Sequence, residues 1–271
     1  MQKLLQMSVN ALPYRLRQHI RHIPGIAAFQ RLVVNRVIAG TPFVHVINAG
    51  PAAGLRFEVL LPQDKAIWAG TYEPEFTRAL VDKVGPGDVC YDIGGYRGYM
   101  TGAMALAGAS RVIVFEPLPA NQEALRRLQE CNPRLSIEIL PVAVGNSSGT
   151  ALLRLMPDTS MGKLSQSTFQ PSAVPVKEIE VRICRIDDLI GHAEIPVPKL
   201  MKIDVEGAEL DVLEGARETL AKHFPTLFIE AHSPALKEAC SDLVRGIGYN
   251  VAMLEKNNLL PPEVCHLICT T

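Results

Sequence analysis

The chain has 271 residues, of which 48% are hydrophobic and 20% are charged. This composition excludes a largely disordered chain and suffices for one large domain, or for a domain with an extension. The formal net charge of −1 conceals an asymmetry, because residues 1–57 contain seven basic and no acidic residues, and the remainder contains 20 basic and 28 acidic residues. We therefore predict a basic extension over residues 1–57 and a main domain over residues 58–271.

The basic extension has a helical pattern over residues 1–40 and one or two short strands over residues 41–64. Its longest uncharged run, Val37–Leu55, is broken by proline, asparagine and glycine, so it does not predict a membrane-spanning helix. Three interpretations of the acid-free segment remain open. It resembles an organelle transit peptide, a helix that contacts a partner or an anionic membrane surface, or a solvated extension that packs on its own domain.

The compartment is predicted from the N-terminus and the cysteines. Polar residues Gln6, Ser8 and Asn10 interrupt the first apolar stretch, which disfavours a secretory signal. The six cysteines form no CxxC pair, a pattern typical of a reducing cytoplasm and unlike a zinc site. We expect a cytoplasmic protein, with peripheral membrane contact through residues 1–40 left open.

From residue 85 onward, apolar runs rich in β-branched residues alternate with helical patterns. Runs that are apolar on both faces are typical of strands buried in a parallel sheet. The alternation predicts an α/β fold with a doubly wound, mostly parallel seven-stranded sheet. The predicted strands are Val89–Ile93, Arg111–Phe115, Ile137–Val144, Leu200–Val205, Thr226–Glu230, Asn250–Leu254 and Val264–Cys269.

Helices are expected between these strands, and one stretch interrupts the alternation. Ser233 and Pro234 are typical of a helix start, as N-cap and first helical residue. Residues 150–156 and 178–186 have strand patterns and predict a hairpin-like insertion, whose intervening loop over 157–175 suggests a lid. The helical stripes are Phe76, Ala79, Leu80 and Val84; Tyr99–Ala107; Leu125 and Leu128; Val212, Leu213, Ala216 and Leu220; and Leu236, Cys240, Leu243, Val244 and Ile247.

A glycine-rich loop follows the first predicted strand, with the spacing Asp92-x-Gly94-x-x-x-Gly98. Glycines allow a sharp turn and the close approach of a ligand. Glu116 follows the second strand, where an acid can accept both hydroxyls of a ribose. A dinucleotide pyrophosphate would be repelled by Asp92, whereas the ammonium and sulfonium groups of S-adenosylmethionine would be attracted. A purely structural turn and an NAD-dependent oxidoreductase remain the alternatives.

Three carboxylates surround the end of the fourth predicted strand, from Asp204, Glu206 and Glu209. Ligands of open α/β sheets bind at this edge. The preference of a helix start for negative charge would account for Glu206 and Glu209, but it accounts poorly for Asp204.

At this point the sequence resembles the FkbM family of S-adenosylmethionine-dependent methyltransferases, over roughly residues 66–234. The family commonly has Ala-Asn where this chain has Gly95-Tyr96. The resemblance implies a class I methyltransferase fold and O-methylation of a hydroxyl on a sugar, glycolipid or natural product, hence a small-molecule or glycan acceptor. No nucleic-acid partner is predicted, because the basic residues of the first segment are interspersed with aliphatic residues and few aromatics accompany them. The matching blocks are Trp68–Pro74, Gly87–Gly94, Phe115–Pro117, Ala143–Gly145, Lys202–Glu209, Leu213–Ala216 and Ile229–His232.

The resemblance also implies roles for individual residues. Asp92 and the loop at Gly94 would hold the methionine part of the cofactor, Glu116 its ribose, and residues near Ala143 and Val144 its adenine. The complete predicted cofactor-binding set is Glu73, Asp92, Gly94, Gly95, Tyr96, Gly98, Glu116, Pro117, Ala143, Val144 and Asp204.

A hydroxyl acceptor loses its proton during methylation, so a general base within hydrogen-bond reach is expected. Asp204, Glu206 and His232 are the predicted catalytic residues, Glu230 is a further candidate, and a structural histidine is the alternative for position 232. No metal is predicted because no tight ligand spacing supports one, although carboxylates with a histidine could hold a divalent ion. A non-catalytic binding module on the same fold, working through the basic extension, remains the competing function.

Overall fold

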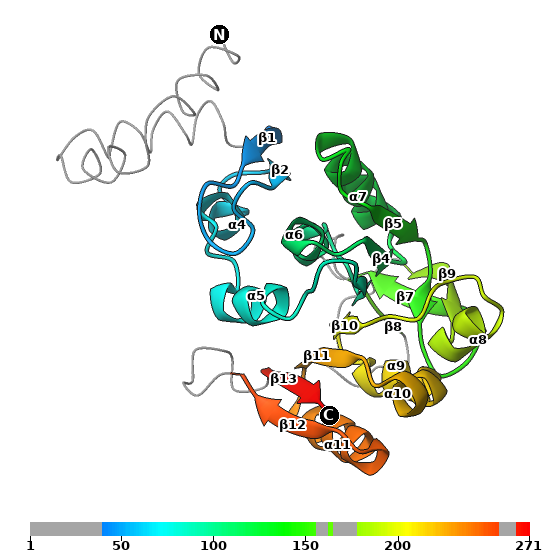
Figure 1. Cartoon of the computed structure of the whole chain (residues 1–271). Helices are drawn as coiled ribbons and strands as arrows, with labels where there is room; N and C mark the ends of the chain where they lie inside the picture. The colour runs from blue at the N-terminus through cyan, green and yellow to red at the C-terminus, as the bar shows by residue number, and fades with distance from the viewer. Residues whose placement is uncertain (1–39, 156–161, 165–177, 255–263) are drawn as a thin grey trace, which may run out of the picture. The chain divides into compact units, whose positions relative to one another are not determined.

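The structure is a computed structural model that describes residues 40–155, 162–164, 178–254 and 264–271 (Figure 1). The chain divides into two compact units, residues 1–72 and 73–271. This division lies beyond the charge-based boundary after residue 57, because residues 56–59 form a strand that pairs within the first unit. The predicted helix over residues 1–40 lies outside the described residues, apart from Gly40.

The described part of the first unit is a short hairpin followed by one helical turn. Strands β1 (Phe43–Val46) and β2 (Arg56–Val59) pair antiparallel, which confirms the strands expected over residues 41–64. Helix α4 (Lys65–Ala69) follows. Among the described residues, no helix combines the length and apolar character that crossing a bilayer requires.

The second unit contains the predicted seven-stranded sheet, with strand order β12-β13-β11-β10-β3-β4-β5. The four pairings from β11 through β10, β3 and β4 to β5 are parallel, whereas β13 runs antiparallel to both of its neighbours. The α/β fold prediction is thereby confirmed. The strands are β3 (Val89–Ile93), β4 (Arg111–Phe115), β5 (Ile137–Leu140), β10 (Leu200–Ile203), β11 (Thr226–Ala231), β12 (Asn250–Met253) and β13 (Cys265–Thr270).

Helices cover both faces of this sheet. Odd-numbered residues of β3, β4, β10 and β11, such as Tyr91 and Ile203, join one buried core with apolar residues of α9, α10 and α11. Even-numbered residues face the other side, where Asp92 contacts Thr101 of α6 and Phe228 packs against Phe76 of α5. The helices are α5 (Pro74–Val81), α6 (Tyr99–Ala107), α7 (Pro119–Cys131), α8 (Ile186–Gly191), α9 (Glu209–Gly215), α10 (Arg217–His223) and α11 (Pro234–Ile247).

The predicted strand Ile137–Val144 was wrong in its extent. It divides at Pro141, which has no backbone N–H to donate to a neighbouring strand. Strand β5 ends at Leu140, and β6 (Ala143–Val144) belongs to a separate four-stranded sheet of order β6-β9-β7-β8. The predicted helical stripe over residues 212–220 likewise divides, at Gly215 and Ala216, into α9 and α10.

The predicted hairpin-like insertion is confirmed in the described residues. Strands β7 (Gly149–Leu155) and β9 (Glu178–Cys184) pair antiparallel, and β8 (Gly162–Leu164) pairs with β7. Most of the loop expected as a lid, over residues 157–175, lies outside the described residues. Ser233 caps α11 as predicted, with its hydroxyl accepting from the N–H of Leu236 at 3.1 Å.

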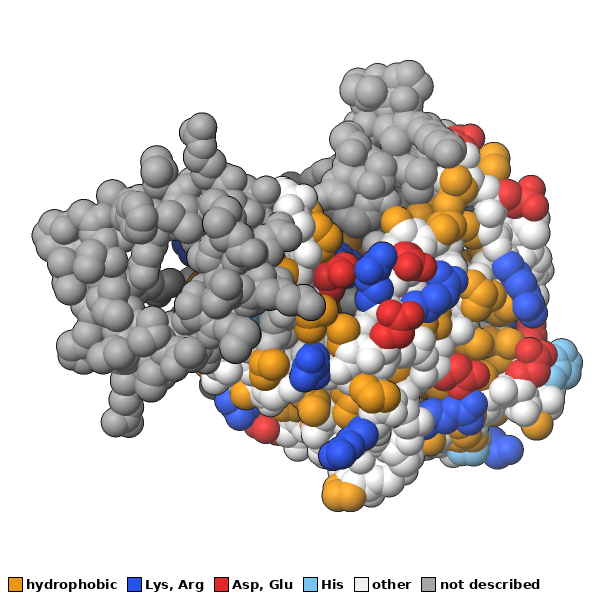
Figure 2. All heavy atoms as spheres, turned by 90° about the horizontal axis from the view of Figure 1, so that it is seen from above, with side chains coloured by type: hydrophobic (Ala, Val, Ile, Leu, Met, Phe, Trp, Pro, Cys, Tyr) orange, Lys and Arg blue, Asp and Glu red, His pale blue; other side chains and the backbone are white. Residues whose placement is uncertain are grey.

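Figure 2 shows one face of the molecule, on which acidic and basic side chains are interspersed among hydrophobic ones. All six cysteines lie among the described residues and are free thiols.

Gly94 sets the separation between β3 and β10 at the end of the sheet that carries the site. Its φ is +81°, and a Cβ at this position would lie 1.8 Å from the carbonyl oxygen of Asp204. Two backbone hydrogen bonds flank this approach, from Gly94 N–H to the Phe115 oxygen and from Asp204 N–H to the Ile93 oxygen, both at 3.0 Å. A side chain at position 94 would therefore separate the two strands.

We expect Gly94→Ala to lower the free energy of unfolding by about 2–5 kcal/mol, because it adds both backbone strain and overlap. Gly87 is the matched control, since its φ is +90° but nothing lies within 4 Å of a Cβ there. Gly87→Ala should cost only the strain, about 1–2 kcal/mol. Urea denaturation of both variants measures the difference, and equal losses would contradict the role assigned to the close approach.

Candidate active site

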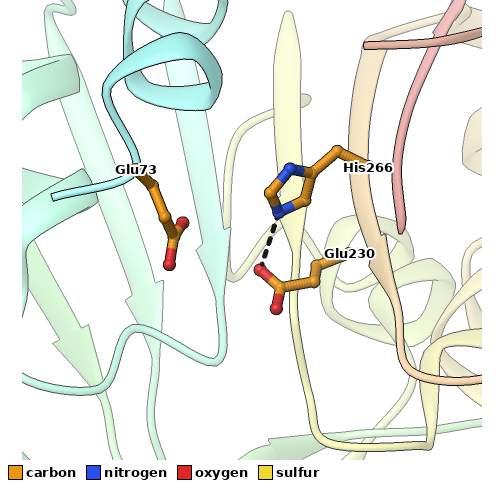
Figure 3. A group of neighbouring side chains, drawn as sticks. All are labelled: Glu73, Glu230 and His266. Carbon is orange, nitrogen blue, oxygen red and sulfur yellow. Dashed lines mark hydrogen bonds and ion pairs between the residues drawn. The ribbon is translucent and has the colours of Figure 1, made fainter. Parts of the chain in front are cut away.

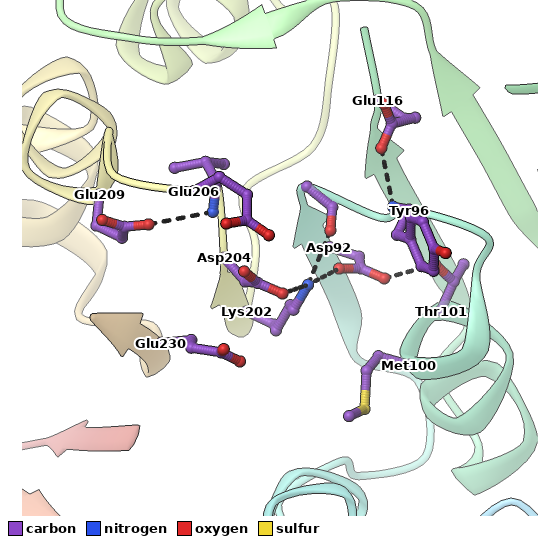
Figure 4. A network of polar contacts seen from close by, with 12 residues as sticks. Asp92, Tyr96, Met100, Thr101, Glu116, Lys202, Asp204, Glu206, Glu209 and Glu230 are labelled. Atoms are coloured by element: carbon purple, nitrogen blue, oxygen red, sulfur yellow. Dashed lines mark hydrogen bonds and ion pairs between the residues drawn. The ribbon is translucent and has the colours of Figure 1, made fainter. Parts of the chain in front are cut away.

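The predicted polar residues meet at the carboxyl edge of the parallel strands (Figure 4). Asp92 is the penultimate residue of β3, and Glu116 and Asp204 directly follow β4 and β10. Glu230 lies at the end of β11, and His232 directly follows that strand. Parallel strands end at one edge of a sheet, so residues that are distant in sequence converge there.

Lys202 holds two of these carboxylates together beneath the edge. It is the register partner of Asp92 on the neighbouring strand, so both side chains point to the same face. Its Nζ lies 3.1 Å from Asp92 Oδ1 and 3.1 Å from Asp204 Oδ2, and it donates to the Gly94 carbonyl at 2.8 Å. The Thr101 hydroxyl donates to the other Asp92 oxygen at 2.5 Å. Lys202 therefore pairs with two carboxylates.

The Gly94 loop, residues 94–98, brings backbone donors to Glu116. The N–H of Tyr96 donates to Glu116 Oε2 at 2.8 Å, and the N–H of Leu118 donates to Oε1 at 2.9 Å. Burial raises the pKa of Glu116 to about 7, against the lowering effect of its hydrogen bonds from Leu118, Asn121 and Tyr96. Glu116 is thus a buried acid whose charge changes near neutral pH.

His232 lies among four carboxylates, those of Asp204, Glu206, Glu209 and Glu230, which we call the His232 cluster. Its Nδ1 hydrogen-bonds Glu209 Oε1 at 2.9 Å. Its Nε2 lies 3.7 Å from Asp204 Oδ1, 3.6 Å from Glu206 Oε2 and 3.5 Å from Glu230 Oε1. The three predicted catalytic residues are therefore neighbours in space.

The His232 cluster determines the protonation of the imidazole. Burial by itself lowers the pKa of His232, but the hydrogen bond to Glu209 and the charges of Asp204, Glu209 and Glu206 raise it to about 9. Burial raises the pKa of Glu206. In this arrangement His232 is an imidazolium at neutral pH, so it does not match the neutral base expected from the sequence.

A second group of side chains shares Glu230 with the His232 cluster (Figure 3). His266 is the register partner of Glu230 on β13, and its Nε2 lies 3.1 Å from Glu230 Oε2. Glu73, at the N-terminus of α5, directs its carboxylate toward this pair. Burial, followed by the charges of Glu230 and Asp204, raises the pKa of Glu73 to about 7.

Backbone strain accumulates at the same edge. Glu73, Tyr96 and Glu206 have φ values of 38°, 49° and 56°, which non-glycine residues rarely adopt. Such residues persist where the surroundings determine them, and they concentrate at functional sites. Each of the three belongs to the predicted set of site residues.

The remaining predicted residues lie in packed surroundings. Ala143 and Val144 are buried in two different apolar clusters, so their predicted contact with adenine stays a prediction. Gly95 and Gly98 allow close packing, because a Cβ would lie 2.0 Å from Val114 and 2.6 Å from Leu128, respectively. Pro117 lies between Glu116 and Leu118, and its carbonyl accepts from Gln122 at 3.1 Å.

Sequence reasoning missed two partners of the site. Thr101, in the first turn of α6, donates a hydrogen bond to Asp92. The sequence of that helix gave no indication of this contact other than the presence of a hydroxyl side chain. His266 is buried in strand β13. A histidine within an otherwise apolar predicted strand could have been recognised from the sequence as a candidate site residue. Glu209 was expected as a helix-start acid; it lies in the first turn of α9 and also bonds His232.

Comparison with known proteins identifies the family. Residues 92–254, more than half of the chain, match the methyltransferase FkbM domain. The chain belongs to the FkbM methyltransferase family. The family predicted from the sequence is thereby confirmed.

Individual relatives are more distant. The hexuronic acid methyltransferase AglP of Haloferax volcanii is 28% identical over 148 residues, which cover 55% of this chain and 58% of the relative. The 31-O-demethyl-FK506 methyltransferase FkbM of Streptomyces tacrolimicus is 28% identical over 198 residues, covering 61% of this chain and 74% of the relative. The chain thus matches little more than half the length of the first relative.

A solved structure supports the fold assignment. The methyltransferase FkbM of Methylobacillus flagellatus superposes with a TM-score of 0.50 at 20% identity, covering 68% of this chain and 43% of that chain. At this identity the likeness bears on the fold alone, and it agrees with the mostly parallel sheet described above.

We expect Lys202→Met to lower the free energy of unfolding by about 3–5 kcal/mol, because it leaves the buried carboxylate of Asp92 without its cation. Lys222→Met is the control, since Lys222 is exposed in the last turn of α10. It should change stability by less than about 0.5 kcal/mol. Urea unfolding at pH 7 measures both, and similar small losses would show that the Lys202 ion pairs contribute little.

Proposed function

We propose that the protein transfers a methyl group from S-adenosylmethionine to a hydroxyl of a small-molecule or glycan acceptor. The observation that carries the proposal is the convergence of the Gly94 loop, Glu116 and the His232 cluster at the carboxyl edge of one parallel sheet. Family membership supports the reaction class and argues against an oxidoreductase.

Each end of this edge suits a different part of the cofactor. Glu116, already held by two backbone N–H groups, would accept the ribose hydroxyls with its remaining lone pairs. The Asp204 carboxylate is partly exposed, at 27%, and would attract the cofactor's ammonium. Asp92 is fully buried and bonded to Thr101 and Lys202, so we propose that it acts by positioning the loop.

Methyl transfer moves CH₃ from the sulfonium to the acceptor oxygen and releases one proton. The cofactor is already activated, so orientation of the acceptor supplies much of the acceleration. We propose that Asp204 and Glu206 accept the hydroxyl proton and that His232 orients both carboxylates. The partial exposure of Asp204 and Glu206, at 27% and 32%, leaves them open to an acceptor.

The acceptor class is inferred from the relatives. One relative is named for methylating a hexuronic acid and the other for methylating an oxygen of FK506. We therefore propose a sugar, glycolipid or polyol natural product as acceptor. Peripheral membrane contact through residues 1–40, which would suit a glycolipid, stays a prediction.

Transfer from labelled S-adenosylmethionine to a panel of hexuronic acids, hexoses and macrolide polyols tests the proposal. We expect Asp204→Asn and Glu206→Gln to lower kcat at least about 100-fold, because a proton acceptor is lost. Asp242→Asn, at an 82% exposed side chain, should leave kcat unchanged. Binding of S-adenosylhomocysteine without transfer to any hydroxyl would favour the non-catalytic module, and no binding at all would contradict the proposed cofactor.

We also expect the affinity for S-adenosylhomocysteine to fall as the pH decreases through 7. The pKa of Glu116 is about 7, and its protonated form loses a lone pair needed for the ribose. Between pH 8 and pH 6 the affinity should fall about tenfold, measured by calorimetry. Glu116→Gln should bind weakly at both pH values, whereas Glu123→Gln, at an exposed site on α7, should keep the wild-type pH dependence. A pH-independent wild-type affinity would contradict the role of Glu116.

A further inference from the structure

We propose that Asp204, Glu230 and His232, assisted by Glu206, form a binding site for a divalent metal ion. The proposal deepens the function above and rests on it only for the role of the ion in methyl transfer. The binding site itself rests on donor geometry, on the orientation of the imidazole and on the charge of the cluster.

The donor atoms are spaced as ligands of one ion. One ligand atom from each of Asp204, Glu230 and His232 lies within 4.8 Å of the others. The distances from His232 Nε2 to the oxygens of Asp204, Glu206 and Glu230 are 3.7, 3.6 and 3.5 Å. Two ligands that each lie about 2.1 Å from a common ion are separated by about 3.0–3.6 Å. The donor-to-donor distances are therefore close to those between ligands of one metal ion, and they are longer than direct hydrogen bonds.

Glu209 orients His232 as a second-layer carboxylate orients a metal-binding histidine. Metal-ligating histidines commonly donate their other ring N–H to a carboxylate, which fixes the tautomer and the ring orientation. Here Nδ1 bonds Glu209 Oε1 at 2.9 Å, and Nε2 is thereby directed toward the three remaining carboxylates. The N–H groups of Val205 and Gly207 in turn hold the same Glu209 oxygen, at 3.3 and 3.0 Å.

Acidic side chains outnumber basic ones at the site. Its ion-pair network joins five carboxyl groups and three basic side chains. This composition would attract a divalent ion, and a ligating imidazole would bind it in the neutral form. The carboxyl groups are those of Asp92, Asp204, Glu206, Glu209 and Glu230, and the basic side chains are those of Lys202, His232 and His266.

The mixed donor set narrows the kind of ion. Carboxylate oxygens suit Mg²⁺ and Mn²⁺, and an imidazole nitrogen adds preference for a transition metal. Mn²⁺ satisfies both requirements and is the probe of choice. Asp204 and Glu206 are 27% and 32% exposed, so the ion would keep open positions on that side.

The open coordination positions of such an ion would bind the acceptor. A metal-bound hydroxyl has a lowered pKa, so the acceptor would lose its proton more readily to the neighbouring carboxylate of Glu206 as its oxygen takes the methyl group. Two adjacent acceptor oxygens would fill two positions at once. The inferred acceptor is therefore a vicinal diol or a hydroxy acid, a chemistry that sugars and uronic acids contain.

The test is titration of the full chain with Mn²⁺, followed by calorimetry and by the paramagnetic resonance signal of free Mn²⁺. We expect one ion per chain. His232→Gln and Asp204→Asn should weaken binding at least about tenfold, and Glu209→Gln, which removes the orienting carboxylate, by about 10–100-fold. His266→Gln tests the other candidate group, since His266 bonds the second oxygen of Glu230. His223→Gln, at an exposed residue of α10, is the control and should bind Mn²⁺ like the wild type.

Binding of S-adenosylhomocysteine shows whether the variants at positions 232, 209 and 266 are folded, and urea unfolding shows it for Asp204→Asn, because Asp204 is itself proposed to bind the cofactor. Loss of Mn²⁺ binding in His232→Gln with retention in His266→Gln supports the proposal. The reverse pattern places the ion at Glu73, Glu230 and His266 and overturns it. A wild-type chain that binds S-adenosylhomocysteine but no Mn²⁺ also overturns it, and leaves the proposed methyl transfer standing.

Discussion

The site depends on the ion pairs of one buried lysine. Lys202 is the register partner of Asp92 across β10 and β3, and it also contacts Asp204 and the Gly94 carbonyl. Because a buried carboxylate is costly without a partner, this cation allows two acids to lie at adjacent strand ends. The close approach at Gly94 then depends on the same register, which sets the position of the whole loop.

The remaining acids of the edge are only partly compensated, and this imbalance determines their chemistry. Burial and mutual repulsion raise the pKa of Glu73 to about 7, and burial raises that of Glu116 to about 7. Burial lowers the pKa of His232, but the hydrogen bond to Glu209 and the charges of Asp204, Glu209 and Glu206 raise it to about 9. A cationic cofactor, and a metal ion in the His232 cluster, would both be favoured by such a site.

Local sequence patterns predicted the elements of the sheet but not all of their limits. Strands Val89–Ile93 and Arg111–Phe115 have the predicted bounds, because short runs of buried β-branched residues between turn signals leave little choice. The strand predicted over Ile137–Val144 was too long. Its apolar pattern continues past Pro141, but the strand that it pairs with changes there from β4 to β9. Periodicity reports burial and does not report which strand a segment pairs with.

By itself, the sequence determined the fold class, the family and most of the acids at the site, because motif spacing and the alternation of strands and helices are local properties. Only the tertiary structure decided which of these groups touch. The register of β3, β10, β11 and β13 pairs Asp92 with Lys202 and Glu230 with His266, and the start of α9 brings Glu209 to His232. Protonation follows from those contacts, since the charge of a buried group depends on its neighbours in space rather than in sequence.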